Sequence, residues 1–396
     1  MEFNKKLLID FPVYQLEGKR VFVRADLNDP ADSEGNLTGD MRIRAVLPTI
    51  GYLVNARAKV ILASHFGRPK NREKEFSLRG VKKRLEELSS FRIHLAPDCQ
   101  GEEVVKMSKE LKNGEVLLLE NLRFCPGETK NDPEYAKFLA SLGDMYVAEA
   151  FGACHREHAS ISSVPKMIPS MAGFLLAKEI NTLNKLLHNP EQPLVVVAGG
   201  KKVSDKIKVI GNLIDKVDSI CVGGGMSFAF LKAKGYEIGK SYVEDNMDNV
   251  AKEILGNNGK KILLPVDVMV AKEIRPASES KVVNIDEIPP DWYGVDIGPK
   301  TIEMFKAQIS KAKTIFWNGP LGIVEIPDFS YGTRIVGLYI ALSSAITVSG
   351  GGDTAEVVRM MNLDQHFTHV STGGGAALKF LEGADLPGIS ALPERS

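Results

Sequence analysis

Short apolar runs alternate with helical patterns along the first half of the chain. The runs predict strands at 21–23, 60–63, 116–119 and 145–147. Between them, apolar residues at helical spacing predict helices over 41–56, 78–88 and 133–142. Strands that alternate with helices favour a parallel sheet covered by helices on both faces, which is an α/β fold.

The second half of the chain repeats this alternation. Its apolar runs predict strands at 194–198, 219–222, 261–264, 314–317 and 346–348. A helical pattern over 174–187 ends at an Asn-Pro pair and separates the two halves, so we expect it to connect two domains. The length of 396 residues also suggests two domains.

Basic residues follow the predicted strands of the first half. The set comprises Arg24, Arg42, Arg68, Arg123, Arg156, His65, His155 and His158. Open α/β sheets bind ligands at the carboxyl ends of their strands, so these side chains are expected to converge on one anion site. Surface arginines in ordinary ion pairs are the alternative. Asp26 and Asn28 are candidates for binding substrate hydroxyls, or are simple turn residues.

Glycine-rich turns take the place of arginines in the second half. The strand predicted at 346–348 leads into three glycines, Gly350 to Gly352, and then into Asp353 and Thr354, either of which is expected to cap a helix. Free N–H groups at a helix N-terminus suit phosphate, and Asp353 beside a polyphosphate is a candidate Mg²⁺ ligand. A plain glycine turn capped by Asp353 is the alternative. Asp267 is expected to lie at the end of another strand, the one predicted at 261–264.

Two lysines follow the first of these glycine loops. Lys202 and Lys206 share a face if residues 203–210 are helical, and their ammonium groups would then bridge nucleotide phosphates. A solvated helix face is the alternative. Together, an arginine-rich half and a glycine- and lysine-rich half favour phosphoryl transfer between a nucleotide and a small anion. A carboxylate acceptor is already ionised, which explains why no general base is evident.

Composition and apolar run length argue against several other classes of protein. Lys plus Arg and Asp plus Glu are equal at 50 each, which argues against a nucleic-acid binder. No apolar run is long enough to cross a membrane and no signal peptide is evident, so a cytoplasmic location is expected.

The scattered cysteines, Cys99, Cys125, Cys154 and Cys221, predict free thiols rather than a disulfide framework. Residues 235–241 resemble a P-loop but have one residue too few between the glycines.

These motifs, taken in order from Gly18 to Leu392, resemble the phosphoglycerate kinase family. The first half contributes VRADLNDP, SHFGRP, ENLRF and AFGACHR. The second half contributes GGKKVSDK, GGGM, WNGP, GGGDT and STGGG.

The resemblance implies the reaction ATP + 3-phosphoglycerate ⇌ ADP + 1,3-bisphosphoglycerate with Mg²⁺. It implies catalytic roles for Arg42, Lys202, Lys206 and Gly374. It implies that phosphoglycerate is bound by Asp26, Leu27, Asn28, Arg42, His65, Phe66, Gly67, Arg68, Arg123 and Arg156. It implies that the nucleotide is bound by Gly200, Lys206, Gly224, Gly294, Asn318, Pro320, Glu325, Gly351, Gly352, Asp353 and Thr354, with Asp353 on the metal.

The resemblance also implies two doubly wound, Rossmann-like domains with parallel sheets. Their expected bounds are 1–172 for the phosphoglycerate domain, 173–188 for the connecting helix, 189–378 for the nucleotide domain and 379–396 for a segment that returns to the first domain. Hinge closure would bring the substrates together, and a monomer is expected. Departures from the family pattern at Asp29, Glu149 and Lys201 leave open a binding or regulatory protein with little catalysis.

Overall fold

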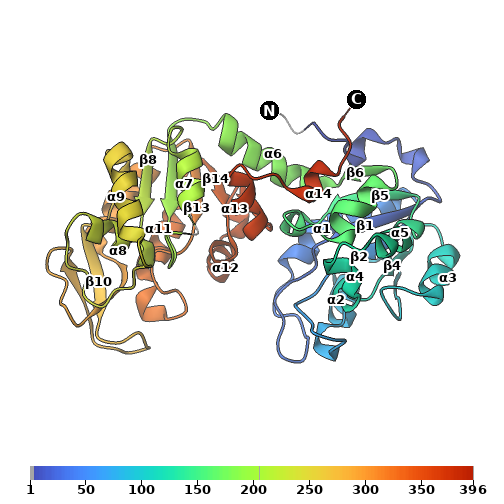
Figure 1. Ribbon diagram of the computed structural model, residues 1–396, viewed down its shortest axis with the longest axis horizontal. Coiled ribbons are helices and arrows are strands. Elements are labelled where there is room, and N and C mark those ends of the chain that lie inside the picture. Colours follow the sequence, from blue (N-terminus) through green and yellow to red (C-terminus); the bar gives the residue numbers. More distant parts are fainter. Residues whose placement is uncertain (1–3, 205, 396) are drawn as a thin grey trace. The chain divides into compact units, whose positions relative to one another are not determined.

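The computed structural model describes residues 4–204 and 206–395. The chain divides into two compact units, which we call unit 1 (Met1–Asn181 with Ala384–Ser396) and unit 2 (Thr182–Gly383). The boundary between them lies inside helix α6 (Phe174–His188). Both units are α/β structures (Figure 1).

Unit 1 is built on a six-stranded parallel sheet in the order β3-β4-β2-β1-β5-β6. Its strands are β1 (Arg20–Ala25), β2 (Lys59–Ala63), β3 (Ile93–Leu95), β4 (Val116–Leu118), β5 (Met145–Glu149) and β6 (Ser170–Ala172). Its helices are α1 (Met41–Asn55), α2 (Arg79–Leu88), α3 (Glu102–Glu110), α4 (Pro126–Thr129), α5 (Pro133–Ser141) and α14 (Pro387–Ser390). The four strands predicted from apolar runs form the centre of this sheet, and the short β3 and β6 form its edges.

Burial on both faces explains why apolar runs identify the central strands. All five residues of β5 are buried, as are the last five of β1. Helix α1 covers the sheet with its apolar stripe, which includes Ile43, Val46 and Ile50. The prediction of a parallel sheet is therefore confirmed for unit 1.

Unit 2 contains a second six-stranded parallel sheet, in the order β15-β14-β13-β7-β8-β9. Its strands are β7 (Leu194–Ala198), β8 (Ser219–Val222), β9 (Ile262–Leu263), β13 (Thr314–Asn318), β14 (Ile346–Ser349) and β15 (His369–Val370). The helices are α7 (Ile207–Leu213), α8 (Gly224–Ala233), α9 (Met247–Asn258), α10 (Pro299–Ile309), α11 (Tyr331–Ala341), α12 (Gly352–Met360) and α13 (Gly375–Leu381). Every residue of β7, β8 and β13 is buried.

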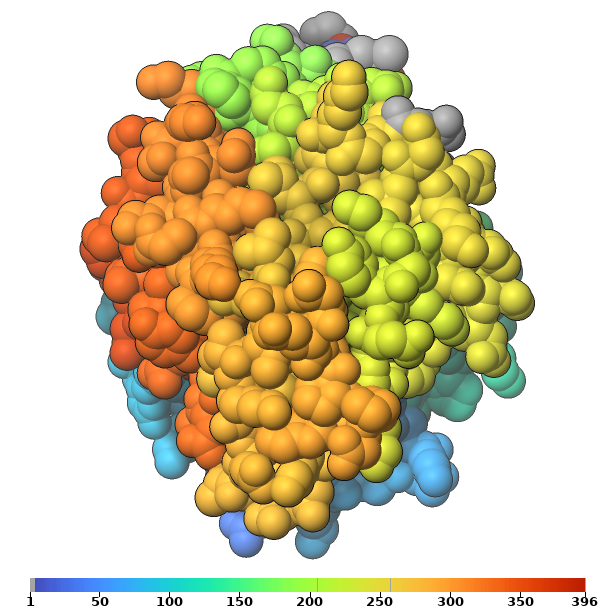
Figure 2. Space-filling model, turned by 90° about the vertical axis from the view of Figure 1, so that its left-hand side faces the viewer, coloured from blue at the N-terminus to red at the C-terminus, as the bar shows by residue number. Residues whose placement is uncertain are grey.

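Unit 2 also carries a small antiparallel sheet that the sequence did not predict. Its order is β11-β10-β12, from β10 (Asp267–Ala271), β11 (Ser280–Asn284) and β12 (Tyr293–Ile297). Figure 2 shows this yellow-to-orange part of the chain at the surface of unit 2. Asp267 begins β10 instead of ending a strand, and its carboxylate accepts the N–H groups of Lys300 (3.0 Å) and Thr301 (2.8 Å) at the start of α10.

The two ends of the chain meet in unit 1. Lys5 and Glu394 form an antiparallel bridge, and the N–H of Lys6 donates to the carbonyl of Pro393 at 3.1 Å. Helix α14 belongs to this unit (Figure 1), where the N–H of Gly388 donates to the carbonyl of Cys154 at 2.9 Å. Among the described residues, none of the helices has the length and apolar character that crossing a membrane requires.

The cysteine prediction was wrong for one pair. Cys99 and Cys125 form a disulfide, whereas Cys154 and Cys221 are buried free thiols. The pair is 26 residues apart in sequence, and the two cysteines follow the neighbouring strands β3 and β4. Spacing along the chain does not reveal that contact; the strand order does.

Candidate active site

The predicted substrate residues of unit 1 lie in loops that follow four adjacent strands. β4, β2, β1 and β5 are neighbours, so their carboxyl ends lie along one edge of the sheet. Asp26 to Asn28 follow β1, His65 to Arg68 follow β2, and Arg123 follows β4 within the short 3-10 helix η4 (Leu122–Phe124). Arg156 follows β5.

Hydrogen bonds join three of these loops. The Oδ1 atom of Asn28 accepts the N–H of Gly67 at 2.6 Å, and Arg123 Nη1 donates to the Gly67 carbonyl. Buried Asn121 accepts the N–H groups of Phe66 (3.1 Å) and Arg123 (3.0 Å) on one side-chain oxygen. These hydrogen bonds therefore hold the loops after β1, β2 and β4 together as one framework.

Arg42 comes from the first turn of α1 and reaches the loop after β1. Its Nη1 donates to the carbonyl of Asn28 at 3.1 Å, and its Nε lies 3.7 Å from an Asp26 carboxylate oxygen. That Nε is buried and makes no hydrogen bond within the described residues. Asp29 is buried and accepts the N–H groups of Arg42 and Ile43, both at 3.0 Å, so it caps the helix that carries Arg42.

Electrostatics show that these groups share one environment. Burial lowers the pKa of His65 well below its usual value; nearby Asp26 opposes that shift and Arg24 adds to it. Burial also lowers the pKa of Arg123 to about 10, with further lowering from Arg156 and Arg24. Burial would raise the pKa of Asp26, but His65 and Arg42 bring it below its usual value. His65 is therefore neutral at neutral pH, and Asp26 is ionised.

Two of the predicted substrate residues have buried side chains. Leu27 has no exposed surface and Phe66 only 4%, and both belong to the core of unit 1. Any contact that they make with a ligand must come from main-chain atoms. The N–H of Leu27 is used internally, since it donates to Ser64 Oγ at 2.9 Å.

Arg24 was expected to converge with the other arginines on an anion site, but it lies in a buried network behind them. Arg24 is fully buried; its Nε donates to Ser160 Oγ at 2.7 Å and its Nη2 lies 3.8 Å from Glu128. Glu128 accepts both the N–H (3.0 Å) and the hydroxyl (2.6 Å) of Ser160. Arg24 is also 3.4 Å from His65 Nδ1, so this network supports the histidine from inside the protein.

The glycine loops of unit 2 contact one another closely. The N–H of Gly200 donates to the carbonyl of Pro320 at 2.7 Å, and the N–H of Gly319 donates to the hydroxyl of Thr354 at 2.7 Å. Gly319 has a φ of 97°, and an added Cβ would lie 2.3 Å from the carbonyl oxygen of Gly199. Side chains at these turns would therefore hold the loops apart.

Two local predictions in unit 2 were wrong. Helix α12 begins at Gly352 with Gly351 as its N-cap, so neither Asp353 nor Thr354 caps it. The hydroxyl of Thr354 instead joins the loops after β13 and β14. Helix α7 begins only at Ile207, with Lys206 as its N-cap, so Lys202 and Lys206 do not share a helical face.

Two neighbouring cavities in unit 2 collect most of the predicted nucleotide residues. The larger, about 750 Å³, is lined among others by Gly200, Gly224, Gly294, Pro320, Glu325 and Asp353. The smaller, about 390 Å³, is lined among others by Lys206, Asn318, Gly351, Gly352, Asp353, Thr354 and Gly374. Asp353 lines both, and Lys202 lines neither.

The larger cavity also has walls that the sequence analysis missed. Phe228 and Tyr242 contribute aromatic surface, and the ammonium of Lys201 lies 4.8 Å from the ring centre of Tyr242. Asp296 forms part of the wall, where burial raises its pKa to about 7 and the N–H groups of Gly332 and Ile297 counteract the shift. Nothing in its local sequence marks Asp296 as a cavity residue.

Oxygen atoms suited to a hard cation border these cavities. The carboxylate of Asp353 is exposed on their common wall. Asn318 Oδ1 is buried and accepts no hydrogen bond within the described residues, while its amide group donates to the Gly350 carbonyl at 2.5 Å. This donor set fits Mg²⁺, which prefers oxygen ligands.

Comparison with known proteins identifies the family of the chain. The family model "Phosphoglycerate kinase" matches residues 11–384. Proteins named phosphoglycerate kinase from Dictyoglomus turgidum and Aquifex aeolicus are 50% and 49% identical over 99% of this chain, and the matches cover 100% and 99% of those proteins. The structure of phosphoglycerate kinase from Coxiella burnetii has a TM-score of 0.85 at 39% identity, covering 98% of each chain. The chain therefore belongs to the phosphoglycerate kinase family.

Proposed function

We propose that this chain transfers a phosphoryl group reversibly between ATP and the carboxylate of 3-phosphoglycerate. As a member of its family it is a kinase with a carboxyl acceptor. The observation that carries the residue assignment is the cluster of Arg42, Arg123 and His65 at the carboxyl edge of the unit 1 sheet, which matches a small substrate with two anionic groups.

In unit 1, the arginines would bind the phosphate and carboxylate of 3-phosphoglycerate. Asp26 and Asn28 would accept a hydrogen bond from the substrate hydroxyl, because both present oxygen atoms in the loop that contacts Arg42. The Nε of Arg42 has an unused donor in a buried position, which suits a group that stabilises charge as the phosphoryl group moves. Neutral His65 would bind by hydrogen bonding, not by charge.

In unit 2, the larger cavity would take the base and ribose, with Gly294 and Glu325 on its wall. The smaller cavity would take the phosphates, near Lys206, Gly374 and the N-terminus of α12. When bound, Mg²⁺ would be held by Asp353 and would neutralise phosphate charge. Lys202, outside both cavities, keeps its proposed contact with the transferring group only as a prediction from the family resemblance.

Direct transfer requires the acceptor oxygen and the terminal phosphate to meet, and their half-sites belong to different units. We therefore propose that the units close on their substrates, which also excludes water from the reaction. A monomeric state and a cytoplasmic location remain predictions from the sequence.

A coupled assay of the purified protein with MgATP and 3-phosphoglycerate tests the proposal. Turnover that depends on both substrates is expected. A binding or regulatory protein, suggested by the departures at Asp29, Glu149 and Lys201, would bind nucleotide without turnover, and that result would overturn the proposed activity.

The metal role of Asp353 has its own test. Replacing it by Asn removes a charged oxygen ligand, so we expect Asp353→Asn to weaken MgADP binding by about tenfold or more while affecting metal-free ADP far less. Calorimetric titration with and without Mg²⁺ measures both. Equal losses for the two ligands would assign Asp353 to nucleotide contact alone.

A further inference from the structure

The Cys99–Cys125 disulfide lies at the base of the segment that carries Arg123. Cys125 ends η4, because its N–H donates to the carbonyl of Leu122 at 3.1 Å, and its own carbonyl accepts the N–H of Glu128 in α4 at 3.0 Å. Arg123 is thus two residues from a covalent cross-link. Glu128, on the other side of the cross-link, supports the buried Arg24 network.

The cross-link connects this segment to the loop after the edge strand β3. That loop has other attachments: Asp98 pairs with Arg72 at 2.8 Å, and the Cys99 carbonyl accepts the hydroxyl of Tyr135 at 3.4 Å. The loop after β3 would therefore keep its place if the disulfide were broken. The segment around Arg123 would lose its covalent link to it.

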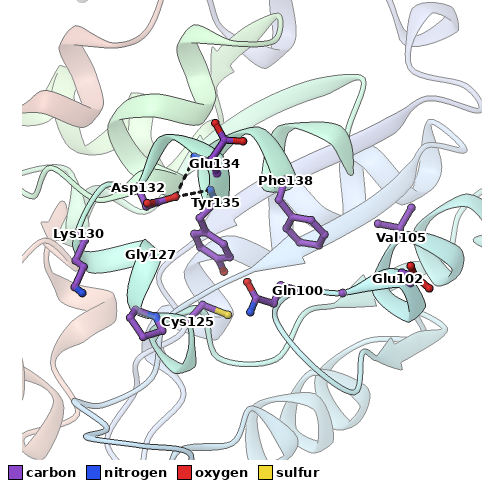
Figure 3. A pocket seen from close by; sticks show the side chains of 12 residues that line it. Gln100, Glu102, Val105, Cys125, Gly127, Lys130, Asp132, Glu134, Tyr135 and Phe138 are labelled. Atoms are coloured by element: carbon purple, nitrogen blue, oxygen red, sulfur yellow. Dashed lines mark hydrogen bonds between the residues drawn. The ribbon is translucent and has the colours of Figure 1, made fainter.

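A cavity of about 820 Å³ in unit 1 reaches the disulfide. Apolar groups of Cys125, Pro126, Tyr135 and Phe138 line it, and charged groups such as Glu102 and Lys130 lie around them. Figure 3 shows the sulfur of Cys125 directed toward Gln100 beneath the ring of Tyr135. Cys125 is 2% exposed and Cys99 is fully buried, so the cavity gives a small thiol, and not a protein, its route to the bond.

We propose that this cavity and disulfide form a thiol–disulfide exchange site that sets the affinity of unit 1 for 3-phosphoglycerate. A thiolate of a small dithiol attacks the sulfur of Cys125, the S–S bond breaks, and Cys99 leaves as a thiolate that takes up a proton. The second thiol of the reagent then displaces Cys125. The protein gains two thiols, and the reagent becomes a cyclic disulfide.

Reduction removes the covalent attachment of the segment that holds Arg123 and leaves it held by hydrogen bonds of Asn121, Leu122 and Arg123. The segment then gains freedom that the substrate must remove when it binds. The expected consequence is a higher KM for 3-phosphoglycerate and an unchanged KM for MgATP, whose proposed cavities lie in unit 2. This inference rests on the proposed role of Arg123 in binding the substrate.

The test compares air-oxidised protein with protein reduced by dithiothreitol in the coupled assay. We expect reduction to raise the KM for 3-phosphoglycerate about three- to tenfold. A Cys99→Ser/Cys125→Ser variant should show the higher KM in both conditions, and Cys221→Ser, a matched control in unit 2, should respond as the parent does. Thiol titration in denaturant should find two thiols in oxidised protein and four in reduced protein, since only Cys154 and Cys221 are free.

Four thiols in the air-oxidised protein, or the same KM in both conditions, would overturn the proposal. An Arg123→Ala variant separates this failure from failure of the proposed function. A raised KM in Arg123→Ala with no effect of reduction rejects the disulfide proposal alone. An unchanged KM in Arg123→Ala rejects the substrate role of Arg123 and with it the inference. If the substrate role of Arg123 and the disulfide proposal are both correct, reduction should not raise the KM of Arg123→Ala further.

Discussion

At the scale of single residues, Asp29 is a departure from the family pattern that adds a carboxylate to the loop after β1, beside the proposed anion site. The structure instead buries it, with 3% of its surface exposed, against the N–H groups of Arg42 and Ile43 at the start of α1. Those partners lie 13 and 14 residues further along the chain, beyond the reach of any local motif. Asp29 therefore positions Arg42 instead of opposing the substrate.

Arg42 is expected to act mainly in the transition state. Arg42→Ala removes a half-buried guanidinium whose buried Nε has an unused donor, so we expect kcat to fall about a hundredfold or more while the Kd for MgADP changes little. Steady-state kinetics and nucleotide titration measure the two quantities. Arg44→Ala is the matched control, because Arg44 lies on the same helix but is 56% exposed and paired with Asp40. Equal losses of turnover and nucleotide affinity in Arg42→Ala would contradict this role.

Gly294 shows how a missing side chain shapes a cavity. A Cβ at this position would lie 1.9 Å from the ring of Phe228, which also lines the larger cavity. We expect Gly294→Ala to displace that ring, lower the free energy of unfolding by about 1–3 kcal/mol and raise the KM for ATP with little effect on 3-phosphoglycerate. Adding Phe228→Leu should recover part of both losses. No recovery would mean that the steric conflict is not the cause.

At the scale of elements, apolar runs predicted the central strands and the edge strand β9, but missed β3, β6, β15 and the antiparallel sheet. β7 and β8 match the predicted ranges because every residue in them is buried between two layers of helices. β11 has three exposed residues among its five, and β3 and β6 each include a polar residue among only three positions, so no apolar run marks them. The antiparallel sheet was missed although β10 has four buried residues among its five, because its partner β11 has no apolar run, and Asp267 was misread with it.

Helix α6 is fixed to unit 1 by a residue that departs from the family pattern. The carboxylate of Glu149, at the end of β5, accepts the N–H groups of Leu175 (3.1 Å) and Leu176 (2.8 Å) and the hydroxyl of Thr49. An added Cβ at Gly173 would lie 2.3 Å from the carboxyl carbon, so this glycine leaves room for the longer acid. Burial raises the pKa of Glu149 to about 7, even though these hydrogen bonds lower it.

This pKa predicts a pH dependence of stability. A carboxyl group with a pKa of about 7 in the folded state and about 4.5 in the unfolded state favours folding below pH 4.5, and loses that contribution as the pH rises through 7. Glu149→Gln should therefore reduce the fall in unfolding free energy between pH 5 and 8 by up to about 3 kcal/mol. Urea denaturation between pH 5 and 8 measures the free energy of unfolding, and Glu157→Gln, at an exposed position, is the control. Parallel curves for Glu149→Gln and the parent would show that Glu149 does not titrate there.

At the scale of the whole molecule, the sequence predicted which residue types would gather but not which loops would meet. Convergence was expected because several of the arginines follow parallel strands, and the order β4-β2-β1-β5 places the loops that carry Arg68, Arg123 and Arg156 along one edge of the sheet. The same topology brings Cys99 to Cys125 and Arg24 to Glu128, contacts that depend on strand order and have no local signal. Sequence reasoning thus led to two proposed half-sites and missed the buried groups behind them.

The last prediction concerns the two units together. The phosphoryl donor and acceptor are proposed to bind in different units, and reacting atoms must come within about 3–3.5 Å for direct transfer. We expect the radius of gyration, measured by small-angle X-ray scattering, to be smaller with MgADP and 3-phosphoglycerate together than with either alone. This pair cannot react, because the transferable phosphoryl group is missing, so the closed state accumulates. Arg42→Ala should weaken the compaction, because the variant lacks the guanidinium that would make a contact only in the closed state. An identical radius of gyration in the free, singly bound and doubly bound protein would contradict domain closure.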